Sequence, residues 1–189
     1  MAKIVTEDIG GFNHHYPKVA AVITASAGGK DSAMAAAWHS SISLKPPLYG
    51  ISLFPGRFTY ELMAESGEFG INFLPFEKAS LVAAAGGFSG RDCDKFQRLS
   101  LIKEKPLKTG VPVLREAYAA YECRIEDTRA YGDHLWIVGR IVAVHFVEEM
   151  LAEKKNFDPA HVRPLLYLGL DYYASADASS YQHVRRGTG

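Results

Sequence analysis

The sequence predicts one mainly β domain of the α+β class, an antiparallel β-barrel with short peripheral helices. Strand-length stretches of apolar and β-branched residues recur between glycines and prolines, and the helical stretches between them are short. No regular alternation of strand and helix is present, which argues against a doubly wound parallel sheet. The length of 189 residues, with 48% hydrophobic and 22% charged residues, fits a single globular domain over residues 1–189.

The first predicted strand covers residues 18–25, where apolar and β-branched residues follow a proline. Gly28-Gly29 is typical of a tight turn, so the stretch 28–43 is expected to return alongside this strand as a hairpin. That stretch, GGKDSAMAAAWHSSIS, has two interpretations. Its alanines favour a buried helix over 33–39. Its serines and its short helical length favour a strand whose small side chains leave the backbone accessible.

Two strands with a short helix between them are predicted next in the chain. Residues 48–54 alternate between large apolar and other side chains and predict a half-buried strand. Residues 59–66 predict a short helix, with Thr59 near its N-cap and Gly67 as its stop. Residues 69–74 alternate again and predict a strand.

Two further short helices are predicted before the long strands. The first covers residues 77–85 and ends at a glycine doublet. The second opens at Ser89 to Asp92, where S-x-x-D resembles a capping box, and Lys95 and Phe96 follow about one turn later.

The second half of the chain predicts a long antiparallel hairpin. Residues 116–131 form its first strand, Gly132-Asp133 its turn and residues 134–147 its second strand. A helix is expected over 148–155, and a mixed apolar and aromatic stretch with a central glycine covers 163–173.

Charge and cysteine content exclude several classes of function. The 21 basic residues balance 21 acidic ones, so no overall field attracts nucleic acid or an anionic membrane.

Cys93 and Cys123 stand far apart without histidines beside them, so we expect free thiols rather than a zinc site or a disulfide. His14 and His15 point in different directions on a strand and lack a third ligand, so we expect no metal. With no apolar leader or membrane-length apolar run, we expect a cytoplasmic protein.

Two segments place a cationic side chain near a hydroxyl group at a predicted helix start. Arg57 precedes Thr59, and Ser89 precedes Lys95. Helix N-termini carry unpaired N–H groups and a positive dipole end, so these segments are candidate phosphate sites. A solvated surface role is the alternative for each cation, and neither segment alone decides between the two.

Small residues in the stretch 28–43 offer a second part of the same ligand site, beside the part formed by the cations. In the strand interpretation, Ala33, Ala35, Ala36 and Ala37 allow a flat ligand to approach the backbone closely. Backbone N–H and C=O groups would then bind the edge of the ligand's ring.

Several blocks of the sequence, in this order, resemble the flavin reductase-like family, whose fold is the FMN-binding split barrel. The blocks are VITA, GGKDSAMAAAWHSSISLKPPL, PGRFTYELMAESGEFGINFL, SGRDCDKF, EAYAAYECRIE and GDHLWIVGRIVAV. The resemblance covers roughly residues 16–147 and continues more loosely through PLLYLGLDYYA. Members of this family are typically homodimers that hold FMN near the subunit interface. They pass electrons from NADH, NADPH or another redox protein to flavin or a further acceptor.

The resemblance implies a flavin site built from three blocks of this sequence. The first block lies along the flavin ring and ends in two serines where ribityl or phosphate contacts are usual. The other two lie on the phosphate side, with Lys95 the preferred phosphate partner of the last. Block by block, the residues are Met34, Ala35, Ala36, Ala37, Trp38, Ser40 and Ser41; Arg57, Thr59 and Tyr60; and Ser89, Gly90, Asp92, Lys95 and Phe96.

One departure from the family pattern concerns the ring-binding block. Relatives often carry Asn-x-x-Thr-Ala-Ser-Trp where this chain has Ser32-Ala-Met-Ala-Ala-Ala-Trp38. Ala35 and Ala37 therefore lack hydroxyl groups, which leaves flavin recognition there to the backbone.

The roles of His134, Trp38 and Tyr173 have two interpretations each. His134 lies at the block where some relatives have a histidine near the nicotinamide or flavin, where it would orient substrate. A surface or hydrogen-bonding role is the alternative. Trp38 and Tyr173 either stack on the ring or fill the core. The resemblance also suggests that Asp171, Tyr172 and Tyr173 close the pocket beside a partner subunit.

These features predict an FMN-dependent oxidoreductase that accepts a hydride from NADH or NADPH and passes electrons to free flavin or another acceptor, such as a partner monooxygenase. GGKDSA is not a G-x-G-x-x-G motif, so the nicotinamide would stack directly on the flavin in an open cleft. A flavoredoxin-type electron carrier reduced by a partner protein is the second hypothesis. A non-redox split-barrel protein with a haem or pyridoxal-type ligand is the third. The family resemblance also implies that the protein is a homodimer.

Overall fold

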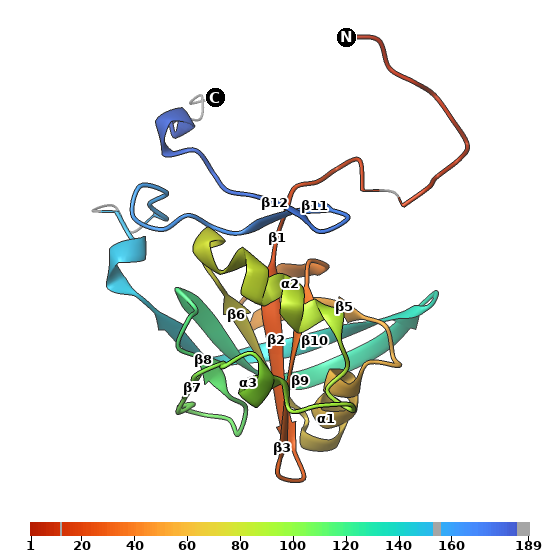
Figure 1. Ribbon diagram of the computed structural model, residues 1–189, viewed down its shortest axis with the longest axis vertical. Helices are drawn as coiled ribbons and strands as arrows, with labels where there is room; N and C mark the ends of the chain where they lie inside the picture. Colours follow the sequence, from red (N-terminus) through yellow and green to blue (C-terminus); the bar gives the residue numbers. More distant parts are fainter. Residues whose placement is uncertain (12, 153–155, 185–189) are drawn as a thin grey trace.

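The chain folds around a strongly curved antiparallel sheet. The structure, a computed structural model, describes residues 1–11, 13–152 and 156–184. Within this part of the chain, the main sheet has seven strands in the order β3-β2-β6-β9-β10-β5-β4, and every pairing in it is antiparallel. A smaller sheet, β1-β11-β12, lies above one end of it, and β7 pairs with β8 (Figure 1). The predicted mainly β class is confirmed.

The bounds of the elements follow the chain. The strands are β1 (Lys18–Val19), β2 (Ala21–Ala27), β3 (Lys30–Ala36), β4 (His39–Leu44), β5 (Pro47–Leu53), β6 (Glu68–Phe73), β7 (Lys103–Glu104), β8 (Val113–Leu114), β9 (Ala119–Tyr131), β10 (His134–Phe146), β11 (Leu166–Gly169) and β12 (Tyr172–Ala174). The helices are α1 (Phe58–Ser66), α2 (Ala79–Gly87) and α3 (Lys95–Arg98), with short 3-10 turns η1 (Phe76–Lys78), η2 (Glu148–Met150) and η3 (Ala178–Ser180).

The stretch 28–43 forms strands, so the strand interpretation is confirmed and the buried helix over 33–39 is wrong. Gly28 and Gly29 adopt positive φ values of 56° and 74°, which make the tight turn between β2 and β3. Every residue of β2 then pairs with one of β3. This continuous ladder outweighs the helix propensity of the alanines, which is worth only tenths of a kcal/mol per residue, on the order of 0.5.

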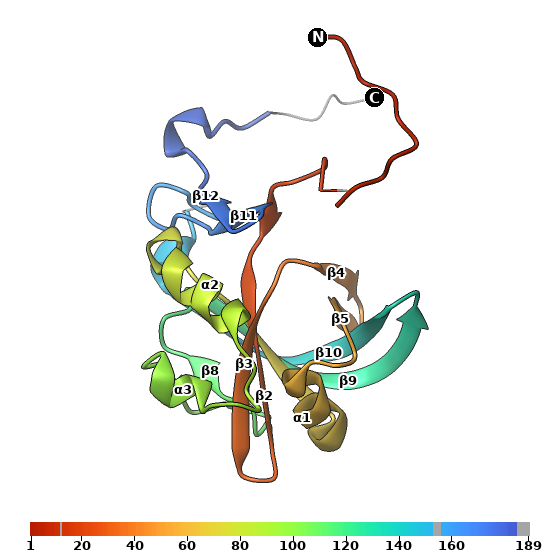
Figure 2. The ribbon, with the colours of Figure 1, turned by 45° about the vertical axis from the view of Figure 1, so that its right-hand side comes forward.

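The β9–β10 hairpin supplies the curvature of the main sheet. Its strands have 13 residues each, and Gly132 forms the predicted turn with φ 63°. The register shifts twice, between Val138 and Gly139 and between Ile141 and Ala143. Such irregularities bend a strand pair, and Figure 2 shows the hairpin curving beneath β5.

Two helix boundaries differ from the predictions. Helix α1 begins at Phe58, with Arg57 as its N-cap residue, so Thr59 lies inside the first turn; Gly67 ends the helix with φ 71° as predicted. The capping box predicted at Ser89 is wrong. Asp94 caps α3 instead, accepting from the Gln97 N–H at 3.1 Å, because Ser89 is used in an earlier turn where its Oγ accepts from the Arg91 N–H at 3.2 Å.

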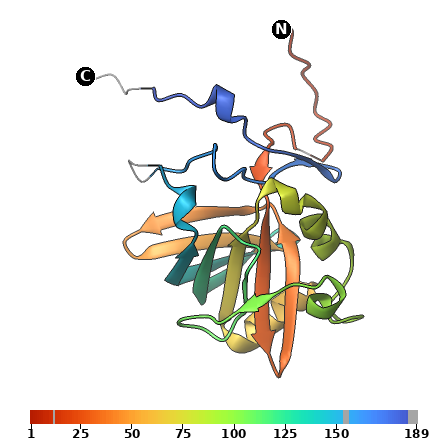
Figure 3. The ribbon, with the colours of Figure 1, turned by 60° about the vertical axis from the view of Figure 1, so that its left-hand side comes forward.

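The C-terminal part also differs from the predictions. The expected helix over 148–155 is limited to the 3-10 turn η2, because Leu151 forms an extended bridge with Phe157; residues 153–155 of that prediction lie outside the described residues. Strands β11 and β12 pair with each other, and β11 pairs with β1. Figure 3 shows that the N-terminal residues and the last described residues, up to 184, lie at this end of the molecule. None of the helices in the described ranges has the length and apolar character to cross a membrane.

A buried carboxylate fixes the loop between β7 and β8. Glu122 of β9 is fully buried and accepts hydrogen bonds from the N–H groups of Leu107, Lys108 and Thr109 at 2.6–2.8 Å. His145 Nε2 lies 2.6 Å from the same carboxylate. Burial alone would raise the pKa of Glu122, but the hydrogen bonds from His145 and the loop outweigh it and lower the pKa to about 2.

We expect Glu122→Gln to lower the free energy of unfolding at pH 7 by about 2–3 kcal/mol, because an amide presents a donor to N–H groups that need an acceptor. The lowered pKa means that this stabilisation is present above the ordinary carboxyl pKa and is lost as the pH falls toward about 2. Urea unfolding at pH 7 and pH 3 measures both effects. Glu126→Gln, on the same strand but in a partly exposed ion pair with Arg140, is the matched control and should cost less than about 1 kcal/mol. Equal losses in the two variants would contradict this assignment.

Candidate functional site

Three hollows meet at Ala35 on the edge strand β3. We name them by the side chains that line them: the cation arm by Arg57, Arg91 and Lys95, the tyrosine arm by Tyr167 and Tyr173, and the aromatic arm by Trp38, Phe54 and His134. Their volumes are about 330, 460 and 160 Å³, respectively. Ala35 lines all three, so together they form one branched site.

Lys95 of α3 is the most buried cation of the site. Its side chain is 3% exposed, and its Nζ donates to the Ala33 carbonyl of β3 at 2.9 Å and to the Ala85 carbonyl of α2 at 2.7 Å. Burial lowers the pKa of Lys95, nearby Cys93 opposes this, and the charge of Arg57 lowers it further. Since an ammonium group has three N–H donors, one remains for a ligand in the cation arm.

Arg57 and Arg91 differ in how their guanidinium groups are engaged. Arg91 donates to the Gly56 carbonyl at 3.1 Å and pairs with Glu61. The exposed side chain of Arg57 makes neither a hydrogen bond nor an ion pair with any described residue. Helix α1 begins at the next residue. The N–H groups of Phe58 and Thr59 donate to no described residue, whereas the Tyr60 N–H donates to the Arg57 carbonyl at 3.0 Å. The cation arm therefore combines a guanidinium group with a helix N-terminus, an arrangement that suits a phosphate.

Glycines allow the backbone segments around the cation arm to pack closely against one another. A Cβ on Gly90 would lie 2.7 Å from the Phe58 ring and 2.8 Å from Ser32 Oγ. A Cβ on Gly86 would lie 3.3 Å from the Ala35 methyl group. The Ser32 hydroxyl is already engaged with Thr59 Oγ1 at 2.9 Å. The backbone of α2 and of the Ser89–Gly90 turn thus approaches β3 closely, with no room for larger side chains.

Strand β3 presents backbone groups to the site because it is an edge of the main sheet. The Ala33 carbonyl points away from β2, since it accepts from Lys95. Orientation repeats every second residue in a strand that pairs without a bulge, so the N–H and C=O groups of Ala35 also point away from β2. They offer one donor and one acceptor to the edge of a flat ligand.

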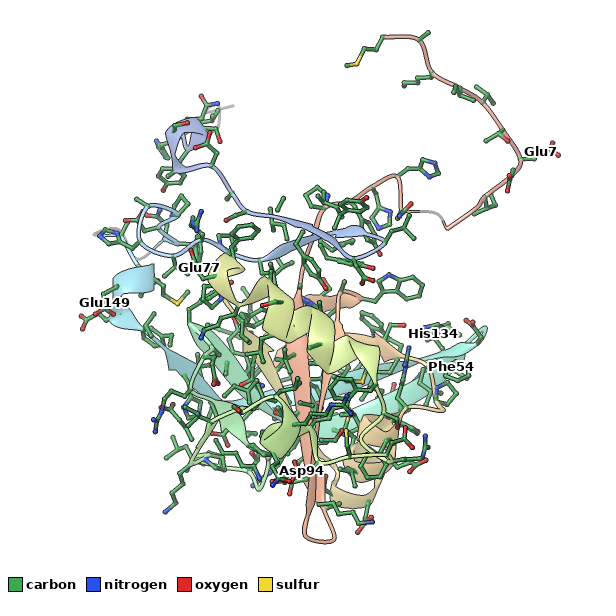
Figure 4. The ribbon with its side chains drawn as sticks, in the orientation of Figure 1. Glu7, Phe54, Glu77, Asp94, His134 and Glu149 are labelled. Carbon is green, nitrogen blue, oxygen red and sulfur yellow. The ribbon has the colours of Figure 1, made fainter. Side chains whose placement is uncertain are left out.

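The aromatic arm is built from aromatic rings that contact one another. The Trp38 and His134 ring centroids lie 4.9 Å apart with planes tilted by 40°, and Phe54 meets His134 at 6.2 Å in an edge contact. Figure 4 shows Phe54 and His134 side by side. Trp38 Nε1 donates to the Tyr16 hydroxyl at 2.9 Å, and His134 Nδ1 lies 2.7 Å from Asp133. The His134 hydrogen bond lowers the pKa of the Asp133 carboxyl.

The structure brings most of the sequence-predicted residues together. Those lining the three arms are Met34, Ala35, Ala36, Ala37, Trp38, Arg57, Thr59, Ser89, Gly90, Lys95 and His134. The remaining predicted residues lie elsewhere. Ser40 and Ser41 line a separate hollow of about 470 Å³ beside His39 and Tyr49, and Asp92 lines a neighbouring hollow with Cys93. Tyr60 packs against the core, and Phe96 is buried in it.

Sequence reasoning missed several residues of the site. These are Phe54, Gly56, Phe58, Gly86, Gly87, Phe88, Arg91 and Tyr167. From the sequence, the doublet Gly86-Gly87 predicts only a helix stop, although in the structure it also marks a close backbone approach. Arg91 stands inside the predicted SGRD block and was the available signal there. Tyr167 had none, because its position depends on pairing between β1 and β11. Among the described residues, no cluster of three histidine, cysteine or acidic side chains is arranged to hold a metal.

Comparison with known sequences places the chain among flavin-associated proteins. Residues 13–176 match the family model described as flavin reductase like domain. A relative of undescribed activity from Aeropyrum pernix is 33% identical over 82% of this chain, which spans 58% of that relative's length. The NADH-dependent flavin reductase StyB of Pseudomonas fluorescens is 35% identical over 55% of this chain and 56% of its own.

Solved structures agree with this result. An FMN-binding protein from Thermus thermophilus is 34% identical, with a TM-score of 0.85 over 97% of this chain and 99% of its own. A flavoredoxin from Methanosarcina acetivorans is 25% identical, with a TM-score of 0.80 over 97% of this chain and 95% of its own. A protein with a split barrel domain from Shewanella frigidimarina shares the fold at 18% identity, with a TM-score of 0.83 over 94% and 89% of the two chains. The fold is therefore a split β-barrel, and the chain belongs to the flavin reductase-like family.

Proposed function

We propose that this protein is an FMN-binding oxidoreductase that takes a hydride from NADH or NADPH and passes electrons to free flavin or another acceptor. The observation that carries the proposal is the branched site at Ala35, where a cation arm suited to phosphate adjoins an edge strand with an exposed backbone donor and acceptor. FMN has the matching parts: a terminal phosphate and a flat ring with a polar edge. The likeness to the Thermus FMN-binding protein and to StyB supports the same assignment.

In this proposal, each part of the site has one role toward FMN. Arg57 and the N–H groups of Phe58 and Thr59 at the start of α1 bind the phosphate, and the backbone of Ala35 bonds to the ring edge. Lys95 holds β3 and α2 at the spacing the ring needs and offers its remaining N–H to the ligand. The bound flavin supplies the hydride and electron chemistry, for which the protein needs no nucleophile.

His134 and Trp38 are proposed to position the reductant. They form an aromatic wall beside Ala36 and Ala37, on the open side of the site. Asp133 accepts a hydrogen bond at His134 Nδ1 and so fixes the orientation of the imidazole ring. Because the chain has no dinucleotide-binding fingerprint, the nicotinamide would stack in this opening without a separate nucleotide domain.

An electron carrier of the flavoredoxin type is the second candidate, and the likeness to the Methanosarcina flavoredoxin favours it. Such a protein would bind FMN through the same residues but would take electrons from a partner protein. In either case we propose a homodimer, on the family resemblance.

The proposal predicts that the purified protein shows flavin absorption bands, either as isolated or after loading with FMN. Stopped-flow mixing with NADH and NADPH should then bleach the flavin band, and steady-state assays should show nucleotide oxidation with added FMN. A bleached band with at least one nucleotide supports the oxidoreductase. A flavin band that neither nucleotide bleaches identifies the carrier. If the protein binds no flavin, both the oxidoreductase and the carrier proposals are wrong.

We expect Arg57→Ala and Lys95→Met to weaken FMN binding with different side effects. Arg57→Ala removes a charge-assisted contact of about 1.5–3 kcal/mol, so the dissociation constant for FMN should rise by one to two orders of magnitude while stability stays unchanged. Lys95→Met leaves two carbonyls without their donor, so the free energy of unfolding should also fall by about 2–4 kcal/mol. Fluorescence titration with FMN and urea unfolding measure the two effects. Arg129→Ala, an exposed residue of β9, is the control. Wild-type FMN affinity in both variants would remove the phosphate assignment.

We expect His134→Ala to lower kcat/KM for the nicotinamide nucleotide by about tenfold, because positioning groups act on the bound reductant. The dissociation constant for FMN should stay within about twofold of the wild-type value, since His134 lies outside the cation arm. Steady-state kinetics and FMN titration test this, with the exposed His161→Ala as the control. A loss of FMN binding with unchanged kcat/KM would reverse the assignment.

A further inference from the structure

The segment that precedes the main sheet, residues 13–19, lies between two parts of the branched site. We call it the N-terminal connector. On one side it contacts the β11–β12 hairpin, where Lys18 and Val19 pair with β11. The Asn13 side chain packs on the turn of this hairpin, since a Cβ on Gly169 would lie 2.4 Å from Asn13 Nδ2. Figure 1 shows the chain entering β1 beside β11 and β12. On its other side the connector contacts the residues that follow β3.

Tyr16 is the residue of the connector that reaches toward both the aromatic arm and the tyrosine arm. Its hydroxyl accepts a hydrogen bond from Trp38 Nε1 at 2.9 Å, and Trp38 in turn contacts the His134 ring. Its ring lies against Tyr167, with centroids 5.9 Å apart and planes tilted by 54°. Tyr167 then contacts Tyr173, with centroids 5.3 Å apart. These side chains form a continuous series from one arm to the other, with Tyr16 at its centre.

The backbone and the side chain of Trp38 are held by different parts of the chain. The Trp38 carbonyl accepts from the Ser52 N–H of β5 at 2.8 Å, which attaches the backbone to the main sheet. The Trp38 side chain is 39% exposed, and such a side chain keeps one rotamer only where its contacts offset the lost rotamer freedom. The Tyr16 hydroxyl supplies a polar contact of this kind. Tyr16 is not among the described residues that line the three arms, so it acts on the site through Trp38.

A second contact attaches the connector to the residue after Trp38. His39 Nε2 lies 2.9 Å from the Val19 carbonyl, and His39 Nδ1 lies 2.8 Å from the Tyr49 hydroxyl. Because a carbonyl only accepts, Nε2 carries a proton, and Nδ1 of the neutral ring accepts from Tyr49. Burial lowers the pKa of His39, which favours this neutral form. Removing the Tyr16 hydroxyl should therefore leave the connector in place.

We propose that Tyr16 is a positioning residue for the reductant: by holding the Trp38 indole, it sets the shape of the opening beside Ala36 and Ala37 in which the nicotinamide stacks. The inference rests on the proposed function, because it takes Trp38 as part of the wall beside the bound reductant. An indole free to rotate would have to be ordered each time the reductant binds, at a cost in affinity. An indole held by Tyr16 is already ordered, so the Tyr16 hydroxyl acts on the KM for the nucleotide more than on kcat.

NMR of the ¹⁵N-labelled full-length protein tests the contact itself, without any assay of activity. The chain has two tryptophans, Trp38 and Trp136, so its spectrum contains two indole N–H signals, which Trp38→Phe assigns. In Tyr16→Phe, the Trp38 signal should shift and its N–H should exchange with solvent about tenfold faster or more. The Trp136 signal should stay in place and shows that the variant is folded.

Steady-state kinetics of the FMN-loaded protein tests the role of the contact. Tyr16→Phe should raise the KM for the nicotinamide nucleotide by about three- to tenfold, the effect of one hydrogen bond. The kcat and the dissociation constant for FMN should stay within about twofold of the wild-type values. Tyr181→Phe, which removes an exposed hydroxyl that contacts Asn156 outside the three arms, is the matched control and should leave KM unchanged.

A double variant tests whether Tyr16 acts through Trp38. Because Trp38→Phe already removes the indole N–H, adding Tyr16→Phe should change KM by less than about twofold.

The inference fails if Tyr16→Phe leaves the Trp38 signal or the KM unchanged, or if the effects of the two single variants multiply in the double variant. Failure of the proposed function appears separately in the unmodified protein, as absent flavin binding or absent nucleotide oxidation. The role of Tyr16 toward the reductant is then wrong as well, while the indole signals still decide whether Tyr16 holds Trp38.

Discussion

A buried ammonium group sets the geometry on which the site depends. Lys95 donates to the carbonyl of Ala33 on the edge strand and to the carbonyl of Ala85 near the end of α2, so one side chain of α3 connects both elements. Each carbonyl would otherwise be an unpaired acceptor in a nearly dry environment, and the ammonium would be an unpaired charge. Because each group needs the others, the spacing between β3 and α2 is fixed. That spacing is the gap from which the cation and tyrosine arms open.

This spacing also explains the alanines of β3. Side chains alternate along the strand, so Ala33 and Ala35 face the cluster beneath α2, while Met34 and Ala36 face the interior of the barrel. At Ala35 the helix approaches so closely that Gly86 has no room for a methyl group without contact at 3.3 Å. A hydroxyl-bearing side chain at Ala35 would need part of that gap. The small side chains of β3 and the close approach of α2 therefore depend on each other. With no larger side chain at Ala35, its backbone is the part of β3 that can contact a ligand.

The fold was predictable from local patterns, and the site only in part. Alternation, glycine turns and the long hairpin around Gly132 are signals within a few residues of one another, and the structure confirms them. Arg57, Lys95 and the alanine stretch are candidates on local chemistry alone, and the family resemblance joins them into one flavin site. The engagement of Lys95 with two carbonyls was not predictable, because it depends on contacts with residues 62 and 10 positions away. The capping box at Ser89 failed for the opposite reason, since Asp94 offered a better-placed cap nearby.

The small β1-β11-β12 sheet divides the site between two parts of the chain. Residues 21–146 contain all seven strands of the main sheet and every residue that lines the cation arm and the aromatic arm. Tyr167, Asp171 and Tyr173 of the tyrosine arm come from residues 166–174, which pair with β1 and not with the main sheet. Substitutions in this C-terminal segment can therefore change one arm without disturbing the strand register of the barrel. Residues 166–174 are therefore the part of the site that can change in sequence with the least effect on the strand pairing of the main sheet.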